Sequence, residues 1–351
     1  MPLLARMLAA PLLIDVRPGA VAGLGALLAD RRIATSGRVA VAVGPGQGDS
    51  IAAELSIGAA EVFRVPGGGH TAAVELGTRL RAGAYEAVAG IGGGKVIDIT
   101  KFAAHMAGIP MVAVATNLAH DGIASPVSSL EHESGKGSYG VSMPVAVVVD
   151  LDRVRQAPDP LGRAGIGDVI SNLSAVADWE LAAADTGEQV DGLAAAMGRA
   201  AAESVLRQPG GIGDESFLAV LADALILSGQ AMAVAGTSRP SSGACHEISH
   251  AIDQLFPKQA QQHGEQCGVG ALFATHLRGD LLLAAEMAEV LTRHELPVTP
   301  SDLGLGIDQF VDAVTYAPQT RPGRYTILEH LDLSRSEIHD AVKGYVATYA
   351  R

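Results

Sequence analysis

The segment Gly92-Gly-Gly-Lys-Val-Ile-Asp98 decides the fold prediction, because it joins an apolar run to a helical pattern. The run at residues 87–91, Ala-Val-Ala-Gly-Ile, is typical of a buried parallel strand. Glycines at a strand-to-helix turn let the backbone approach phosphates, and the first turn of the helix directs unpaired N–H groups at them. The order of strand, glycine turn and helix therefore predicts a site for a dinucleotide pyrophosphate.

A second apolar run, at residues 111–115, leads into the loop Thr116-Asn-Leu-Ala-His-Asp-Gly-Ile-Ala-Ser-Pro126. This loop carries the polar side chains that a ribose or a nicotinamide needs. Gly44-Pro-Gly-Gln-Gly48 follows another predicted strand in the same way. It is either a second turn facing the cofactor or an ordinary turn. These loops favour a nucleotide-dependent enzyme.

Composition limits the possible partners. The chain has 351 residues, enough for two domains, and a formal net charge of −13 from 25 basic and 38 acidic residues. That charge argues against binding to nucleic acid or to an anionic membrane, so local groups must hold any anionic ligand. With two cysteines and no secretory leader pattern, a cytoplasmic location is expected. The apolar residues 1–14 contain Arg6 and Pro11, which predicts a strand rather than a membrane span.

Apolar periodicity predicts two different halves. Short β-rich runs at residues 39–43, 62–65, 87–91, 111–115 and 145–149 alternate with helical segments such as 50–55 and 71–81. This alternation predicts a mostly parallel, Rossmann-like sheet with helices on both faces. After Pro158 and Pro160 the pattern is helical, at residues 168–184, 191–207, 217–235, 245–255, 269–278, 281–291 and 336–349. We predict an α/β nucleotide-binding domain over residues 1–155 and an all-α domain over residues 156–351.

Three places in the second half offer metal ligands: Asp168 in a Gly-Asp-Val-Ile-Ser-Asn segment, His246 and His250 in His-Glu-Ile-Ser-His, and His263 in His-Gly-Glu-Gln. One carboxylate and two imidazoles leave a divalent ion with open positions, as a Lewis-acid site requires. His246 and His250 share a helix face because they are four residues apart. Any single histidine is better explained as an ordinary core or surface group, but the three clusters together favour a metal site.

Two other interpretations compete for the same residues. The string from His246 to His250 also fits the H-E-x-x-H pattern of zinc peptidases, in which the glutamate is the general base. A peptidase does not explain the Gly92 turn or the loop that begins at Thr116. Cys245 and Cys267 flank the proposed ligands and either bind a soft metal, form a redox pair or fill small apolar sites; we favour the last.

These motifs together resemble the sn-glycerol-1-phosphate dehydrogenase family. That family lies in a superfamily with iron-type alcohol dehydrogenases, glycerol dehydrogenases and dehydroquinate synthases. The resemblance extends through both halves and is most specific at His120-Asp-Gly-Ile-Ala-Ser-Pro126. It implies a dehydroquinate synthase-like architecture, an NAD or NADP cofactor, one divalent metal with zinc ahead of nickel or iron, and a homodimer.

The resemblance also implies roles for individual residues. Asp168, His246 and His263 would hold the metal, and Asp121, Asp168 and His250 would contact the substrate. Asp121 and His250 would also start the proton relay. The residues expected to contact NAD(H) or NADP(H) are Gly93, Gly94, Lys95, Asp98, Thr116, Asn117, Leu118, Ala119 and Ser125.

The function predicted from this resemblance is metal-dependent hydride transfer between dihydroxyacetone phosphate, a phosphorylated triose, and sn-glycerol 1-phosphate. One alternative is a carbocyclase of the dehydroquinate or cyclitol synthase kind, which uses NAD transiently and returns it unchanged. Others are a dehydrogenase of another polyol or ketone and a degenerate binding or regulatory subunit. A net change in absorbance at about 340 nm separates the dehydrogenases from the carbocyclase, because only they accumulate altered cofactor.

Overall fold

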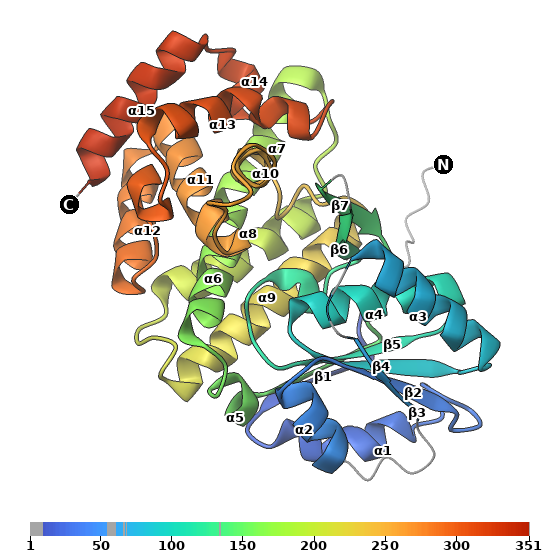
Figure 1. Cartoon of the computed structure of the whole chain (residues 1–351). Coiled ribbons are helices and arrows are strands. Elements are labelled where there is room, and N and C mark those ends of the chain that lie inside the picture. Colours follow the sequence, from blue (N-terminus) through green and yellow to red (C-terminus); the bar gives the residue numbers. More distant parts are fainter. Residues whose placement is uncertain (1–9, 55–60, 66, 68, 133–134, 351) are drawn as a thin grey trace. The chain divides into compact units, whose positions relative to one another are not determined.

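The computed structural model describes residues 10–350 apart from residues 55–60, 66, 68 and 133–134. The chain divides into two compact units, Met1–Pro158 and Asp159–Arg351 (Figure 1). The first unit holds a parallel sheet, and the regular elements described in the second are all helical. The predicted α/β half and all-α half are therefore confirmed.

A six-stranded parallel sheet forms the centre of the first unit. In spatial order its strands are β1 (Leu13–Arg17), β8 (Ala146–Asp150), β5 (Met111–Ala115), β4 (Ala87–Gly92), β2 (Val39–Val43) and β3 (Glu61–Arg64). Every residue of β2, β4, β5 and β8 is buried, as expected for strands covered on both faces. The five predicted strands are confirmed to within one residue at each end.

Helices cover both faces of this sheet. On one face α3 (His70–Ala82) lies beside α4 (Gly94–Ala107), which packs on β4 and β5 (Figure 1). On the other face, side chains of α1 (Leu24–Leu28) and α2 (Gln47–Glu54) join alternate residues of the strands in one apolar core. The helix predicted over residues 50–55 corresponds to α2, and residue 55 lies outside the described part of the chain.

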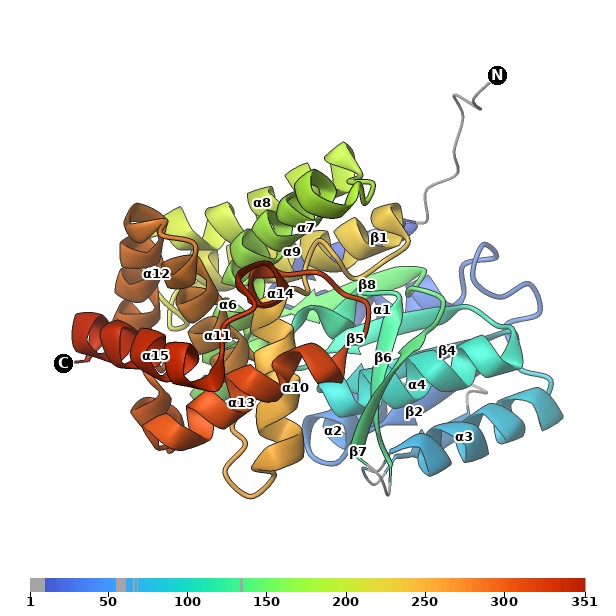
Figure 2. The ribbon, with the colours of Figure 1, turned by 90° about the horizontal axis from the view of Figure 1, so that it is seen from above.

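A two-stranded antiparallel hairpin was not predicted. It consists of β6 (Val127–His132) and β7 (Gly135–Gly140) and lies across α4 (Figure 2). Serine and glycine dominate its sequence, and in β6 only Ser128 and Leu130 are buried, so apolar alternation is weak. Of the strand predicted over residues 1–14, residues 1–9 lie outside the described residues, and β1 begins at Leu13.

The second unit is a bundle of helices. These are α6 (Asp159–Ile170), α7 (Asn172–Thr186), α8 (Gly192–Arg207), α9 (Glu215–Ala235), α10 (Ala244–Leu255), α11 (His263–Leu277), α12 (Leu281–Arg293), α13 (Ile307–Thr320), α14 (Ile327–Leu331) and α15 (Arg335–Tyr349). By length and composition α9 is apolar enough to cross a membrane, yet 61% of its most apolar window is buried inside the structure. It therefore has the character of a core helix.

Two predicted helix boundaries were wrong. The single helix predicted over residues 168–184 is two helices, because α6 ends at Ile170 and Ser171 donates a hydrogen bond from its hydroxyl to the Asp168 carbonyl (2.7 Å). The helix predicted from residue 269 begins at His263. Glycines at positions 264 and 268 lower the apparent helix propensity of residues 263–268. The prediction also omitted α13, which contains Pro318.

Gly167 and Gly264 explain how α6 and α11 pack. A Cβ atom on Gly264 would lie 1.8 Å from the Ala164 carbonyl oxygen, and one on Gly167 would lie 2.2 Å from the Gly264 carbonyl oxygen. The two backbones are therefore in direct contact, which only glycine permits here. This contact places Asp168, near the end of α6, beside His263, the first residue of α11.

We expect Gly264→Ala to lower the free energy of unfolding by about 1–3 kcal/mol, because the added methyl group would push α11 away from α6. Gly344→Ala is the matched control: Gly344 lies inside α15, and an added Cβ meets nothing within 4 Å. That substitution should stabilise the protein slightly, since alanine is the better helix former. Urea unfolding midpoints measure both effects, and equal midpoints for the two variants would contradict the packing argument.

Candidate functional site

The glycine turn lies where the carboxyl ends of three strands meet. Gly92 ends β4, Gly93 precedes α4, and the Gly92 carbonyl accepts a hydrogen bond from the Thr116 N–H at the end of β5 (3.1 Å). At the end of β2, the Gly44 N–H donates to the Ile91 carbonyl (3.1 Å). The Gly44 and Gly92 turns are therefore neighbours, as the first alternative for the Gly44 turn requires.

The loop after β5 explains two of the glycines. A Cβ on Gly93 would lie 2.5 Å from Nδ2 of Asn117, and a Cβ on Gly94 would lie 2.1 Å from Nε2 of His120. The loop is itself braced, since Nδ1 of His120 accepts a hydrogen bond from the Gly122 N–H (3.0 Å). Glycine at both positions therefore leaves room for the Asn117 and His120 side chains, which would have to shift to admit a Cβ.

The predicted cofactor residues differ in exposure. Gly93, Gly94, Asn117 and Ala119 are partly exposed, and Lys95 is exposed, with Nζ 3.0 Å from Oε1 of Glu131. The others, Asp98, Thr116, Leu118 and Ser125, are buried. The first group presents atoms at the surface of the turn, whereas the second group shapes the loop from within.

Lys101 is a buried residue of this region that the sequence analysis missed. Its ammonium group lies 3.2 Å from Oδ1 of Asp98 and donates hydrogen bonds to the carbonyl oxygens of Gly122 (2.7 Å), Ser125 (3.2 Å) and Val127. Its side chain has no exposed surface. A buried cation needs such partners, so Lys101 fixes the loop against α4. The lysine lies three residues after Asp98 on the same helix, but the pattern does not reveal that it points inward.

The second unit brings the three predicted metal ligands together. Oδ1 of Asp168 lies 3.9 Å from Nε2 of His246 and 3.8 Å from Nε2 of His263. With Sγ of Cys267, one ligand atom from each residue lies within 4.8 Å of every other. These residues come from α6, α10 and α11, so the site depends on the packing of three helices.

Neighbouring side chains orient both imidazoles. Nδ1 of His263 lies 3.1 Å from Oγ of Ser249, which accepts a hydrogen bond from Nε2 of Gln266 (2.9 Å). Nδ1 of His246 lies 3.3 Å from Sγ of Cys245. In each ring the Nδ1 side faces a protein neighbour and Nε2 faces Asp168. Such support behind metal-binding histidines fixes the ring orientation.

The donor set fits a divalent metal. A carboxylate, two imidazoles with Nε2 turned toward it and an adjacent sulfur suit zinc, and the nitrogen and oxygen donors also suit iron or nickel. Burial and the neighbouring imidazoles His263 and His250 hold the pKa of His246 well below its usual value, which favours the neutral, metal-binding form.

His250 lies next to the cluster but outside it. Its ring centroid is 6.5 Å from that of His246 and 6.3 Å from that of His263. The peptidase interpretation needs His250 as a ligand and Glu247 as a base beside the ion. Instead, Glu247 is buried, its carboxylate accepts a hydrogen bond from Thr326 (3.2 Å), and burial raises its pKa to about 9. The geometry does not favour a peptidase.

The two cysteines have different surroundings. Both are buried and neither is in a disulfide. Sγ of Cys267 lies 3.5 Å from Nε2 of His263, among the ligand atoms, a position that the small apolar role assigned to it did not anticipate. Cys245 lies behind His246, and burial raises the pKa of its thiol to about 12.

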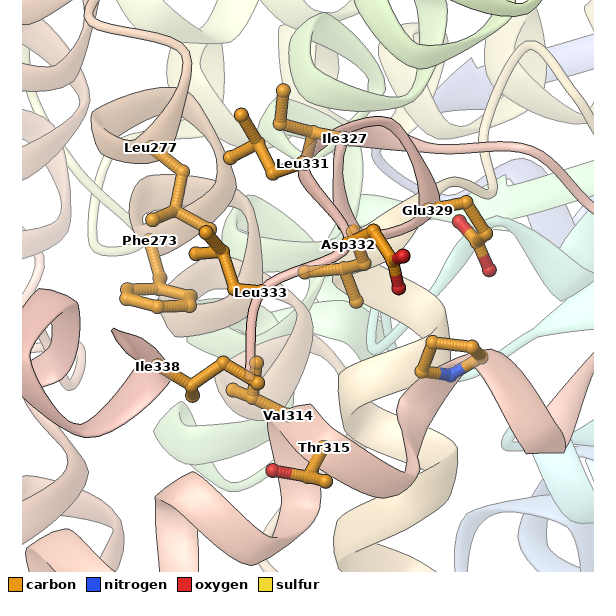
Figure 3. Close-up of a pocket in the computed structure, with 12 residues that line it drawn as sticks. Phe273, Leu277, Val314, Thr315, Ile327, Glu329, Leu331, Asp332, Leu333 and Ile338 are labelled. Atoms are coloured by element: carbon orange, nitrogen blue, oxygen red, sulfur yellow. The ribbon is translucent and has the colours of Figure 1, made fainter. Parts of the chain in front are cut away.

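An apolar pocket of about 170 Å³ lies elsewhere in the helical unit. Phe273 and Leu277 of α11 gather around it with Leu331 and Leu333 (Figure 3). No residue of the proposed metal site lines it. It therefore has no part in the chemistry considered below.

Comparison with known proteins places this geometry in a family. The sequence model described as iron-containing alcohol dehydrogenase matches residues 15–158. The glycerol-1-phosphate dehydrogenase [NAD(P)+] of Pyrococcus furiosus is 42% identical over 255 residues, 72% of this chain and 73% of the relative. The enzyme of the same name from Methanothermobacter thermautotrophicus is 35% identical over 336 residues, 94% of this chain and 95% of the relative.

A solved structure agrees at the level of the fold. A probable glycerol dehydrogenase from Sinorhizobium meliloti superposes with a TM-score of 0.79 at 21% identity, covering 98% of this chain and 99% of that one. The match to the two glycerol-1-phosphate dehydrogenases over most of the chain is the more specific of the two findings. The chain thus belongs to the glycerol-1-phosphate dehydrogenase family.

Proposed function

We propose that this chain is an NAD(P)-dependent glycerol-1-phosphate dehydrogenase, which interconverts dihydroxyacetone phosphate and sn-glycerol 1-phosphate. The observation that carries the proposal is the cluster of Asp168, His246 and His263 in a chain whose relatives bear that name. The carbocyclase alternative is not favoured, because those relatives are named dehydrogenases. A degenerate binding subunit is disfavoured by the complete set of metal ligands.

The nucleotide belongs at the first unit, in the domain predicted over residues 1–155. Gly93 and Gly94 keep the backbone at the start of α4 accessible, and that helix directs its N-terminal N–H groups outward. Asn117 and Ala119 offer partly exposed atoms beside the turn, while Lys95 supplies an exposed cation. The buried residues Asp98, Thr116, Leu118 and Ser125 act by holding the loop in place. The chemistry that a bound nicotinamide supplies is hydride transfer.

The metal belongs in the helical domain predicted over residues 156–351, where Asp168, His246 and His263 would hold it. The chemistry that a divalent ion supplies at such a site is Lewis-acid polarisation of a ketone carbonyl. Ser249 and Cys245 keep the two imidazoles turned toward Asp168. Cys267 packs against His263 and helps to exclude water from that side of the ring.

Proton transfer is assigned to His250 and Asp121. The His250 ring lies beside both ligand imidazoles, so it is placed to donate a proton to a substrate oxygen directly or through water. Asp121 opens the short helical turn Asp121–Ile123 in the loop after β5, and its carboxylate would be the second group of the relay. Asp168, besides holding the metal, would lie against the substrate.

The finer assignments are zinc as the metal, either NAD or NADP as the cofactor, a cytoplasmic location and a homodimer. The histidine donors and the nearby sulfur support zinc. Two free, buried thiols are consistent with a reducing compartment. The homodimer rests on the family resemblance alone, and light scattering of the purified protein tests it.

The central test is NADH or NADPH oxidation followed at about 340 nm with dihydroxyacetone phosphate, beside unphosphorylated dihydroxyacetone and a chelator control. We expect turnover of the phosphorylated ketone that the chelator abolishes and that zinc restores. A stereospecific assay should identify the product as sn-glycerol 1-phosphate. Turnover of neither ketone by metal-loaded protein would contradict the proposal.

Lys101→Met tests how the nucleotide loop is held. Removing the ammonium leaves Asp98 and the carbonyl oxygens of Gly122, Ser125 and Val127 without their shared partner, so we expect the Kd for NADH to rise about 10-fold or more. Metal content and the KM for the ketone should stay near those of the unaltered enzyme. Lys343→Met, at an exposed position on α15, is the control.

Fluorescence titration of NADH gives the affinity, and a thermal melt shows whether the variant is folded. An unchanged Kd for NADH in folded Lys101→Met protein would mean that the loop does not depend on this lysine.

A further inference from the structure

The end of α13 and the residues that follow it, 320–326, lie along the first turn of α10. Oγ1 of Thr320 donates a hydrogen bond to the Glu247 carbonyl oxygen (3.4 Å), and Arg324 donates one from Nη1 to the Ser242 carbonyl oxygen. Oγ1 of Thr326 donates to the Glu247 carboxylate (3.2 Å). These contacts hold Arg321 and Arg324 beside the start of α10, whose first turn carries the proposed metal ligand His246.

The two guanidinium groups converge on one hydroxyl. Nη1 of Arg321 lies 3.4 Å from Oγ of Ser238, and Nη2 of Arg324 lies 2.9 Å from the same atom. Both arginines are partly buried. Two like charges that share a neutral partner repel each other, and burial weakens the screening that water would provide.

No carboxylate of the described residues lies within ion-pair distance of either group. The contrast with nearby arginines is clear. Nε of Arg239 lies 2.8 Å from the Glu188 carboxylate, and Arg278 is paired with Asp178. Burial, with Arg321 as the next cause, lowers the pKa of Arg324 to about 10, so its guanidinium still carries its charge at neutral pH. The Glu247 carboxyl acts on both arginines, but its pKa of about 9 leaves it mostly uncharged at neutral pH, so the pair remains a positive centre in a chain whose net charge is −13.

Ser242 adds a polar atom to this centre. Its side chain is 3% exposed, and its hydroxyl has no hydrogen-bond partner among the residues that the structure describes. Its backbone carbonyl is bound by Arg324, and the next residue, Gly243, precedes the 12-residue helix α10. The first N–H of that helix, at Ala244, already donates to the Asp178 carboxylate (2.8 Å), so the helix start adds no donor here. Two positive side chains and a free buried hydroxyl are the groups that recognise a phosphate.

We propose that Arg321 and Arg324, with the hydroxyls of Ser238 and Ser242, bind the phosphate of a phosphorylated ketone substrate. This inference rests on the proposed function and names the residues that select its substrate. In a triose phosphate only a methylene carbon and the ester oxygen separate the carbonyl carbon from phosphorus, so the phosphate must bind close to the metal ligands. Arg324 binds the Ser242 carbonyl and Thr320 binds the Glu247 carbonyl, on either side of His246 in the sequence, which agrees with that proximity.

A purely structural role explains these residues less well. Arg324 does bind the Ser242 carbonyl, but the one hydrogen bond of Arg321 in the described structure is the 3.4 Å contact with Ser238. If Arg321 served only to bind the Ser238 hydroxyl, a neutral side chain could do so without burying a second charge. Arginine is suited to phosphate because its planar fork donates two parallel hydrogen bonds.

The test compares Arg321→Met and Ser242→Ala with the control Arg199→Met, whose arginine pairs with Glu180 at the surface. The assay is NADH oxidation by the metal-loaded full chain, and inorganic phosphate binding is measured by calorimetry. We expect Arg321→Met to raise the KM for dihydroxyacetone phosphate and the Kd for inorganic phosphate about 10-fold or more. For Ser242→Ala we expect several-fold increases in both. The KM for NADH, the metal content and turnover of unphosphorylated dihydroxyacetone should not change.

The outcomes separate the two claims. If the unaltered enzyme turns over dihydroxyacetone phosphate and both folded variants keep its KM and its phosphate affinity, the arginine site is wrong and the proposed function stands. If the unaltered enzyme does not turn over that ketone, the proposed function fails. Calorimetry then decides the site, because phosphate binding that Arg321→Met abolishes supports it and an absence of binding refutes it. Should Arg321→Met unfold, Ser242→Ala decides, since no hydrogen bond of that hydroxyl is lost.

Discussion

The contact between the backbones of α6 and α11 is the constraint on which the helical unit depends. Gly167 and Gly264 face carbonyl oxygens of the opposing helix at distances that exclude any side chain. Asp168 directly follows one of these glycines and His263 directly precedes the other, so the helices pack most closely where two of the proposed metal ligands face each other. Helix α10 then brings His246 to the same point. The same helix packing therefore both stabilises the unit and brings the three proposed ligands together.

In the first unit, the proposed nucleotide turn also depends on glycines that allow close approach, and a buried lysine stabilises it. Glycines at positions 93 and 94 leave room for the side chains of Asn117 and His120. The Lys101 ammonium holds the same loop by donating hydrogen bonds to the carbonyl oxygens of Gly122 and Ser125. A buried ammonium that is fully paired gives rigidity, whereas the two arginines beside α10 lack carboxylate partners in the described structure. The paired Lys101 ammonium thus has a structural role, whereas we propose that the charges of Arg321 and Arg324 bind a ligand.

Sequence patterns predicted what depends on local periodicity. Strands such as Ala87–Gly92 are continuous apolar runs, so their existence and approximate bounds were predictable. The ligands Asp168, His246 and His263 stood out because they lie in short polar strings among apolar helices. The predicted start of α11 was wrong because packing against α6 offsets the low helix propensity of its first glycines. The break at Ser171 was missed because the apolar pattern continues through it. Lys101, Cys267 and the arginine pair have no local signature, since their roles come from residues distant in the chain.

The most direct test of this account is a calorimetric titration of zinc into metal-free protein, comparing His263→Gln with His276→Gln. Both histidines lie on α11, but only His263 faces Asp168. The account predicts one ion bound per chain, retained in His276→Gln and lost or weakened at least about 10-fold in His263→Gln. Equal stoichiometry and affinity in the two variants would contradict the claim that Asp168, His246 and His263 form the metal site.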